Sequence, residues 1–468
     1  MGGGPPKLRR DSAILFSAEV IQFTFGMIIV ALLVRNLEQS IYGTWIGIIA
    51  VFQLFNFVNF GFPTFINRNI PNNPGLLVDV YPKIRKLQYL LFISTSIVVI
   101  FILITVETQN SAYFRYLLAL ATVSLIFTQI NLSIFNTIGK AYRNIQISLI
   151  DRSITLLLLA LVIEFYNGSE ELLVIAFGIG PVVGLIFSQY FVVREIYGID
   201  RQKTVSYSTS SIVKESIPFS FNLIFAPVFD SVNKLALSFF GGPATLAIFD
   251  VSNRVLMAGN SVTRSLRKIM LPVISYNKSD QNEISRHLKD SITLIKWILP
   301  VGLFFGHIAG MAIPLVFSNI YTESTHIFYL LLISFCLMLI NSPWISYIES
   351  VREPSYSGYM TFFCYTSAII TCLLLVPKFG IYGAASSLIS VQLFFSVFCI
   401  MTSHRIAVVG ITLASYLTMI SASIAYPYCI FVISYQKLPL NSNLIPLVLL
   451  IVISAASGWK IDGYKKKM

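Results

Sequence analysis

Long apolar stretches recur along this chain from Ala13 to Gly458, and no polar stretch between them is long enough to fold alone. Hydrophobic residues make up 56% of the 468 and charged residues 12%, whereas an ordinary soluble chain is roughly 25% charged. A backbone in lipid must satisfy its own hydrogen bonds, which a helix of about 20 apolar residues does. The sequence therefore predicts one all-α, multi-pass membrane domain.

The apolar stretches predict about 14 transmembrane helices of about 20 residues each. They are expected near residues 13–34, 42–67, 87–106, 113–138, 153–166, 172–193, 216–240, 244–270, 290–318, 326–349, 356–376, 380–402, 411–434 and 443–458. The first stretch lacks a small-residue cleavage site, so we expect it to stay as the first span.

The basic residues are distributed unevenly between the predicted loops. If the N-terminus is cytoplasmic, most of the 33 Lys and Arg lie on the cytoplasmic side, and only Arg35, Arg115, Lys378 and Lys437 lie outside. This asymmetry follows the positive-inside rule and predicts that both termini are cytoplasmic. The net charge of +12 is then explained by topology and by contact with anionic membrane lipids, and no nucleic-acid partner is expected.

The five cysteines lie inside apolar stretches and the four histidines are scattered. Neither set has metal-ligand spacing, so the sequence predicts no metal site and no cofactor.

Two stretches of the chain resemble each other. "LEQSIYGTWIGIIAVFQLFNFVNFGFPTFINRNIP" and "FFGGPATLAIFDVSNRVLMAGNSVTRSLRKIMLP" both run from an outer turn through a helix to a basic cytoplasmic end and a proline. The pattern predicts parallel repeats around a central cavity. The expected domains are an N-terminal six-helix lobe (1–203), a C-terminal six-helix lobe (204–404), and two additional helices with a basic cytoplasmic tail (405–468).

Charge is concentrated in the predicted eighth span. At about 100° per residue, Asp250, Arg254, Arg264 and Lys268 fall within one narrow arc of the helix. Arg267 lies off this arc and is interpreted as a cytoplasmic anchor. A charge in hydrocarbon costs about 2.5 to 3.5 kcal/mol on insertion scales, so we expect the arc to face a cavity.

Other predicted spans extend this polar lining. Asn56 and Asn59 share a face of the second span, and Asp230 and Lys234 are spaced i,i+4 in the seventh. The surplus charge is positive, which favours an anion, because Arg donates paired hydrogen bonds to phosphate. The alternative is that Asp230/Lys234 and Asp250/Arg254 are neutralising pairs that only allow the helices to insert.

Three stretches resemble the MATE-like MOP exporter superfamily: "YGTWIGIIAVFQLFNFVNFGFPTFINRNI", "GGPATLAIFDVSNRVLMAGNSVTRSLRKIMLPVIS" and "PKFGIYGAASSLIS". With the span count, the chain is similar to the polysaccharide-exporter branch, and within it to O-antigen repeat-unit flippases (Wzx type). Such relatives often carry an acidic residue near the second span's "GF", where this chain has Asn59. This departure puts a coupling role for the second span in doubt.

The resemblance implies two six-helix lobes around a cationic cavity in the cell inner membrane. It also implies that an undecaprenyl-diphosphate-linked oligosaccharide, an O-antigen or related surface-polysaccharide unit, moves from the cytoplasmic to the periplasmic leaflet by alternating access. The movement would be coupled to an ion gradient, with other polysaccharide-assembly membrane proteins as further partners. The expected substrate-binding residues are Arg254, Arg264, Lys268, Lys234, Asn56 and Asn59, and the expected coupling or ion-pairing residues are Glu19, Asp230 and Asp250.

Two other functions compete with this one. A cation-coupled drug or metabolite antiporter of the same fold would need an acidic, aromatic cavity, and the arginine-rich arc argues against it. A membrane enzyme of polysaccharide assembly would need a long outward loop with catalytic groups, and every predicted outward loop is short. We therefore expect no enzymatic activity.

Overall fold

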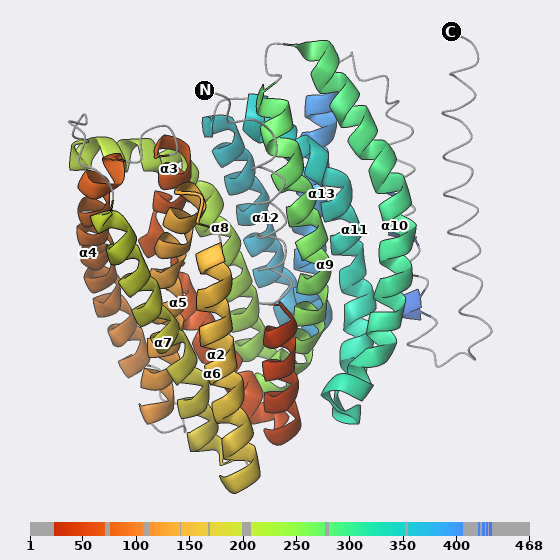
Figure 1. Ribbon diagram of the computed structural model, residues 1–468. Helices are drawn as coiled ribbons and strands as arrows, with labels where there is room; N and C mark the ends of the chain where they lie inside the picture. Colours follow the sequence, from red (N-terminus) through yellow and green to blue (C-terminus); the bar gives the residue numbers. More distant parts are fainter. Residues whose placement is uncertain are drawn as a thin grey trace. The chain divides into compact units, whose positions relative to one another are not determined.

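The computed structural model describes residues 23–70, 75–105, 112–140, 142–166, 169–198, 207–276, 280–351 and 354–405, together with 420–421, 424–425, 427–428 and 430–432. Every element in these ranges is a helix (Figure 1). The predicted all-α class is therefore confirmed. The predicted span at 443–458, and most of the one at 411–434, lie outside the described residues, so the total of 14 stays a prediction.

The helices follow one another with short connections. In the first half of the chain they are Phe23–Asn36, α2 (Gln39–Gln53), the 3-10 helix η1 (Leu54–Asn59), α3 (Phe62–Asn69), α4 (Leu76–Thr105), α5 (Ala112–Thr137), α6 (Tyr142–Tyr166) and α7 (Glu170–Tyr197). They continue with α8 (Thr209–Gly241), α9 (Pro243–Tyr276), α10 (Gln281–Phe317), η2 (Asn319–Tyr321), α11 (Thr322–Val351), α12 (Pro354–Phe379) and α13 (Ile381–Arg405).

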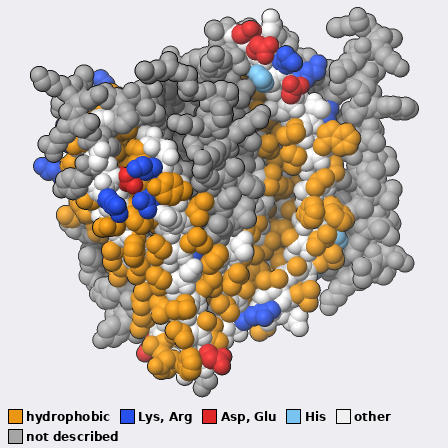
Figure 2. Space-filling view, viewed as in Figure 1, with side chains coloured by type: hydrophobic (Ala, Val, Ile, Leu, Met, Phe, Trp, Pro, Cys, Tyr) orange, Lys and Arg blue, Asp and Glu red, His pale blue; other side chains and the backbone are white. Residues whose placement is uncertain are grey.

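Eight helical segments in the described part are long and apolar enough to cross a membrane. They are Gln39–Asn59, Leu120–Thr137, Tyr142–Tyr166, Glu170–Ile196, Asn282–Phe317, Asn319–Val351, Tyr356–Phe379 and Ile381–Met401. Figure 2 shows hydrophobic side chains over most of the described surface on one face, with charged side chains in a few small groups. These features are those of a multi-pass membrane protein. The cytoplasmic location of both termini stays a prediction.

The chain divides into two compact units, residues 1–235 and 236–468, with the division inside α8. In the first unit α7 packs against α5 and α6, and α2 and α3 pack against α5. In the second unit α11 packs against α9, α10 and α13, and it is buried along almost its whole length. The lobe boundary that the sequence repeat places at 203/204 stays a prediction.

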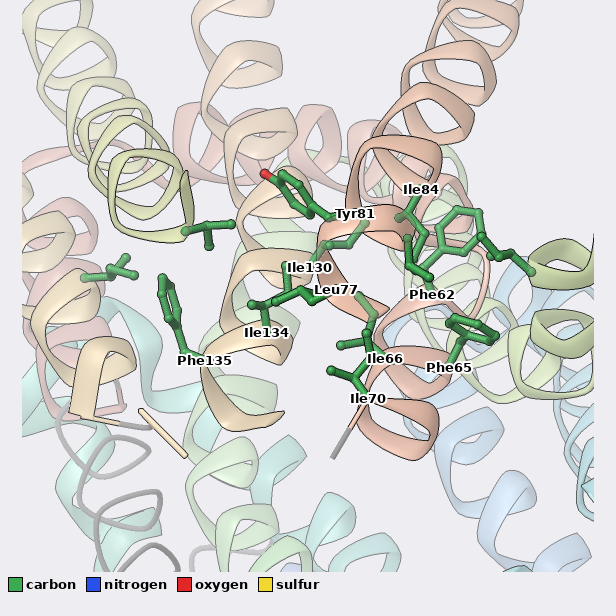
Figure 3. Close-up of a cluster of buried hydrophobic side chains, with 14 residues drawn as sticks. Phe62, Phe65, Ile66, Ile70, Leu77, Tyr81, Ile84, Ile130, Ile134 and Phe135 are labelled. Atoms are coloured by element: carbon green, nitrogen blue, oxygen red, sulfur yellow. The ribbon is translucent and has the colours of Figure 1, made fainter. Parts of the chain in front are cut away.

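A cluster of apolar side chains fixes the position of α3 in the first unit. Phe62, Phe65 and Ile66 of α3 are fully buried against residues of α4 and α5 such as Leu77 and Ile130 (Figure 3). Burial of side chains of this size contributes about 1.5–3 kcal/mol each. The eight-residue α3 is therefore stabilised mainly by the packing of these side chains.

The helix expected over residues 42–67 is interrupted between η1 and α3. Phe60 (φ 38°) and Gly61 (φ 72°) both adopt left-handed backbone conformations that an α-helix cannot contain. Pro63 then lies in the first turn of α3, where its missing N–H is tolerated. A single continuous helix in this stretch was the wrong expectation.

Several helices begin earlier than the apolar pattern predicts. α4 begins at Leu76 rather than near 87, α6 at Tyr142 rather than near 153, and α10 at Gln281 rather than near 290. The additional turns contain charged residues that a search for apolar runs excludes. Several of them, including Arg85 and Asp151, are buried inside the first unit.

Glycines allow α6 and α7 to approach closely. A Cβ on Gly180 would lie 1.9 Å from Thr155 Oγ1 and 2.6 Å from the backbone oxygen of Asp151. Gly180→Ala should therefore force the two helices apart, and overpacking of this kind costs about 1–3 kcal/mol. We expect a lower thermal unfolding midpoint for the purified variant in detergent. In the matched control Gly26→Ala a Cβ meets nothing within 4 Å, and equal midpoints for the two variants would contradict this packing.

Candidate functional site

A buried arginine organises the interior of the first unit. Arg85 of α4 is 7% exposed, and its guanidinium donates hydrogen bonds to groups on three helices. Nε donates to Tyr81 Oη (3.1 Å) and Nη1 to Gln88 Oε1 (2.6 Å), both on α4. Nη2 donates to Asn131 Oδ1 of α5 and to Gln189 Oε1 of α7 (3.1 Å). Arg85 thus links α4, α5 and α7.

A chain of side-chain amides leads from this arginine to the surface of the unit. Gln88 Nε2 donates to Asn59 Oδ1 (3.0 Å), and Asn59 Nδ2 donates to Gln129 Oε1 (2.8 Å). Gln129 is exposed, and its Nε2 lies 3.4 Å from Asn56 Oδ1. Asn59 is therefore a buried link beside the break at Phe60, and its role in substrate binding stays a prediction.

The charge of Arg85 is held by neutral groups only. No carboxylate in the described part of the chain forms an ion pair with it. A buried cation of this kind is tolerated because every N–H finds an acceptor, and hydrogen bonds to charged groups contribute about 1.5–3 kcal/mol each. This cluster is not apparent in the sequence, where Arg85 falls in a predicted cytoplasmic loop. Its amide-bearing partners, at i+3 and on two later helices, carry no local sequence signal.

Asp230 and Lys234 form an ion pair on α8. Lys234 Nζ lies 2.8 Å from Asp230 Oδ2, and Lys234 is 8% exposed. The i,i+4 spacing predicted from the sequence therefore brings the two charges together.

In the second unit, Asp250 and Arg254 form the corresponding pair on α9. Arg254 Nε donates to Asp250 Oδ2 at 2.6 Å. The aspartate is 1% exposed, whereas the arginine side chain is 36% exposed. The acid is therefore sealed inside the unit, and the accessible part of the pair is a guanidinium.

The other predicted residues fall into three groups. Arg264 and Lys268 belong to α9, but their side chains are not among those that the structure describes. Glu19 lies outside the described residues. Arg267 pairs with Glu349 of α11 at 2.5 Å, so it anchors two helices to each other.

The accessible groups are the Arg254 guanidinium, the amides of Gln129 and Asn56, and the Asp230 carboxylate, whose side chain is 24% exposed. Among the described residues, no group of three or more His, Cys, Asp or Glu side chains could hold a metal ion. Such an arrangement can bind an anion or a hydroxyl-rich ligand by hydrogen bonds.

A family model described as "Polysaccharide biosynthesis protein" matches residues 8–278, more than half of the chain. A comparison with curated proteins finds no match.

Several solved structures share the fold. An inward closed structure of the lipid II flippase MurJ has a TM-score of 0.66 at 15% identity, covering 95% of this chain and 98% of that one. An outward-facing multidrug resistance MATE family transporter of the MOP superfamily has a TM-score of 0.63 at 14% identity, covering 87% and 97%. A MOP superfamily transporter from Pyrococcus furiosus, described as having a binding pocket of reverse polarity, has a TM-score of 0.60 at 14% identity, covering 87% and 98%.

Arg85→Lys tests whether the guanidinium fork, and not its charge alone, holds the first unit together. Lysine offers three donors on one atom in place of five on a planar fork. We expect a loss of about 1–3 kcal/mol for each buried acceptor left without a donor, measured as thermal or denaturant unfolding. The neighbouring Lys86 is exposed, so Lys86→Gln should change stability by less than about 0.5 kcal/mol. Equal stability of the two variants would show that the cluster contributes nothing.

Proposed function

The chain belongs to the family of polysaccharide biosynthesis proteins, within the MOP exporter superfamily, and we propose that it is a flippase for a lipid-linked oligosaccharide. The substrate is an undecaprenyl-diphosphate-linked oligosaccharide of the O-antigen or a related surface polysaccharide. It moves from the cytoplasmic to the periplasmic leaflet of the inner membrane by alternating access. Both termini are cytoplasmic, and other membrane proteins of polysaccharide assembly are its expected partners.

The observation that carries this proposal is the asymmetry of the Asp250–Arg254 pair. The carboxylate is buried while the guanidinium is partly accessible, so a ligand meets positive charge. A guanidinium suits a diphosphate because its planar fork donates two hydrogen bonds to phosphate oxygens. Arg264 and Lys268 on the same helix extend the proposed cationic surface.

The amides of the first unit suit the sugar portion of such a substrate. Gln129 is exposed and Asn56 is half-buried at the surface end of the amide chain. A hydroxyl group that leaves water loses several kcal/mol unless it finds a hydrogen-bond partner. These two amides replace water for the sugar, while the prenyl tail remains in lipid. Asp230, Asp250 and Glu19 are the acids proposed to take part in coupling or ion pairing.

A cation-coupled antiporter is the second candidate, because a multidrug resistance MATE transporter has a similar fold. Its ligand would be a cation, which would meet the accessible Arg254 rather than the sealed Asp250. At the Asp250–Arg254 pair the accessible group therefore favours the flippase. The structural neighbours are transporters and flippases, and we propose no enzymatic activity.

The double variant Asp250→Asn/Arg254→Gln distinguishes a substrate contact from an insertion device. It removes both charges together, so neither residue of the pair is left charged without its partner. If Arg254 binds the diphosphate, translocation should fall about ten- to hundredfold, which corresponds to about 1.5–3 kcal/mol for a hydrogen bond to a charged group. The measurement is translocation of an undecaprenyl-diphosphate-linked oligosaccharide in proteoliposomes.

Arg286→Gln serves as the control, because that side chain is 72% exposed near the start of α10. It should translocate like the unaltered protein. Full activity of the double variant at normal protein level would identify the pair as a device for insertion and would remove Arg254 from the site.

Arg264→Ala should also abolish export of lipid-linked units without loss of the protein from the membrane. Its charge has no acid one turn away on the same helix, so neutralising it takes no partner from a neighbouring carboxylate of α9. The measurement is export in cells together with the amount of protein in the membrane fraction. Normal export by this variant would exclude Arg264 from substrate binding.

A further inference from the structure

One face of α6 is both buried and polar. The residues buried along this helix include Asn144, Ser148, Asp151 and Thr155, spaced at three and four residues. Most of the exposed side chains of α6 are apolar, such as Leu157 at 62% exposure. α6 therefore directs this set of polar residues into the first unit.

Asp151 is the acid within this polar face. The residue is 7% exposed, and its buried Oδ1 atom has no hydrogen-bond partner among the described residues. Arg152 Nε lies 3.7 Å from Oδ2, which is too far for a hydrogen bond. An ionised carboxylate held this loosely in the interior is costly, because its charge has lost water and gained no donor.

Packing alone does not account for an acid at this position. Small residues and hydroxyl groups are common where membrane helices approach closely, and Ser148 and Thr155 serve that purpose here. The glycines of α7 fit over the aspartate itself, since a Cβ on Gly184 would lie 3.1 Å from Asp151 Cβ. An asparagine or a serine would fill the same space without a charge.

The surroundings of Asp151 favour a proton over a metal ion as its ligand. Gly180 lies so close to Thr155 Oγ1 that even a methyl group does not fit between them. A metal ion would need several oxygen ligands arranged around an open space. A proton needs only the unpartnered Oδ1.

We propose that Asp151 is a proton-binding site between α6 and α7, and that its protonation couples transport to a proton gradient. A proton from water forms an O–H bond with Oδ1, the carboxylate becomes a neutral acid, and release of the proton restores the charge. The coupling role rests on the proposed flippase function, whereas proton binding does not.

The other charged groups near this site are few. Arg152 is the one described side chain that forms an ion pair with Asp151. α7 presents glycines to it, and its charged residues Glu170, Glu171, Arg194 and Glu195 lie at least nine residues from Gly180 or Gly184, about 13 Å along the helix. α5 contributes charge only at its two ends, through Arg115 and the following Lys140, and Lys140 pairs with Glu195.

A direct test measures the protonation of Asp151 without any substrate. Infrared difference spectra of the purified protein during a pH titration should contain a carboxylic-acid carbonyl band that Asp151→Asn lacks. Glu164→Gln is the matched control, because Glu164 is an exposed acid on the same helix, and it should retain the band. Asp151→Glu should shift the band, which identifies it even if the asparagine variant folds poorly. A band unchanged in both Asp151 variants would overturn the proposal.

A second measurement tests the coupling. In proteoliposomes with an undecaprenyl-diphosphate-linked disaccharide, an imposed pH gradient should accelerate translocation by the unaltered protein and by Glu164→Gln. Asp151→Asn should lose this acceleration while it still exchanges substrate without a gradient. Equal acceleration in Asp151→Asn would overturn the coupling role. Absence of translocation in every protein, together with the infrared band, would instead reject the flippase function and leave the proton site in place.

Discussion

A polar group in hydrocarbon costs several kcal/mol unless a partner lies within reach, and this cost determines where the charges of this protein lie. Arg85 donates hydrogen bonds to neutral acceptors. Lys234 and Arg254 each pair with one aspartate on the same helix, and Arg267 pairs with a glutamate on a neighbouring helix. Each arrangement allows a charged residue to enter a helical bundle. They differ in what remains accessible, and of these only Arg254 combines a sealed partner with a partly exposed guanidinium.

The helical class and most helix positions follow from the apolar stretches, because about 20 consecutive apolar residues have few alternatives in a membrane. The i,i+4 pairs were also predictable, since the helical repeat places Asp230 over Lys234 and Asp250 over Arg254. The buried cluster around Arg85 was not. Its members lie on α4, α5 and α7, and only the tertiary packing of three helices brings them together.

Charged residues within long helices also mislead an interpretation based on hydrophobicity. Arg85 and Asp151 were both placed outside the predicted spans, because a run of apolar residues was required. Both are buried in helices that extend beyond those runs. The break at Phe60 escaped prediction for a related reason, since its left-handed backbone depends on the packing of η1 and α3. In each case the packing of neighbouring helices determines whether the charged side chain is buried or the helix is interrupted.

The close approach of α6 and α7 has a mechanical consequence. Thr155 of α6 lies against Gly180 of α7, and Asp151 lies against Gly184, so side chains of α6 fit into hollows that the glycines of α7 leave. Two surfaces that interlock in this way resist sliding along their common axis, because packed interfaces change between discrete arrangements rather than deforming continuously. Any rearrangement of the first unit during a transport cycle must then carry α6 and α7 together as one body, with their displacement taken up at neighbouring helices that lack such glycines.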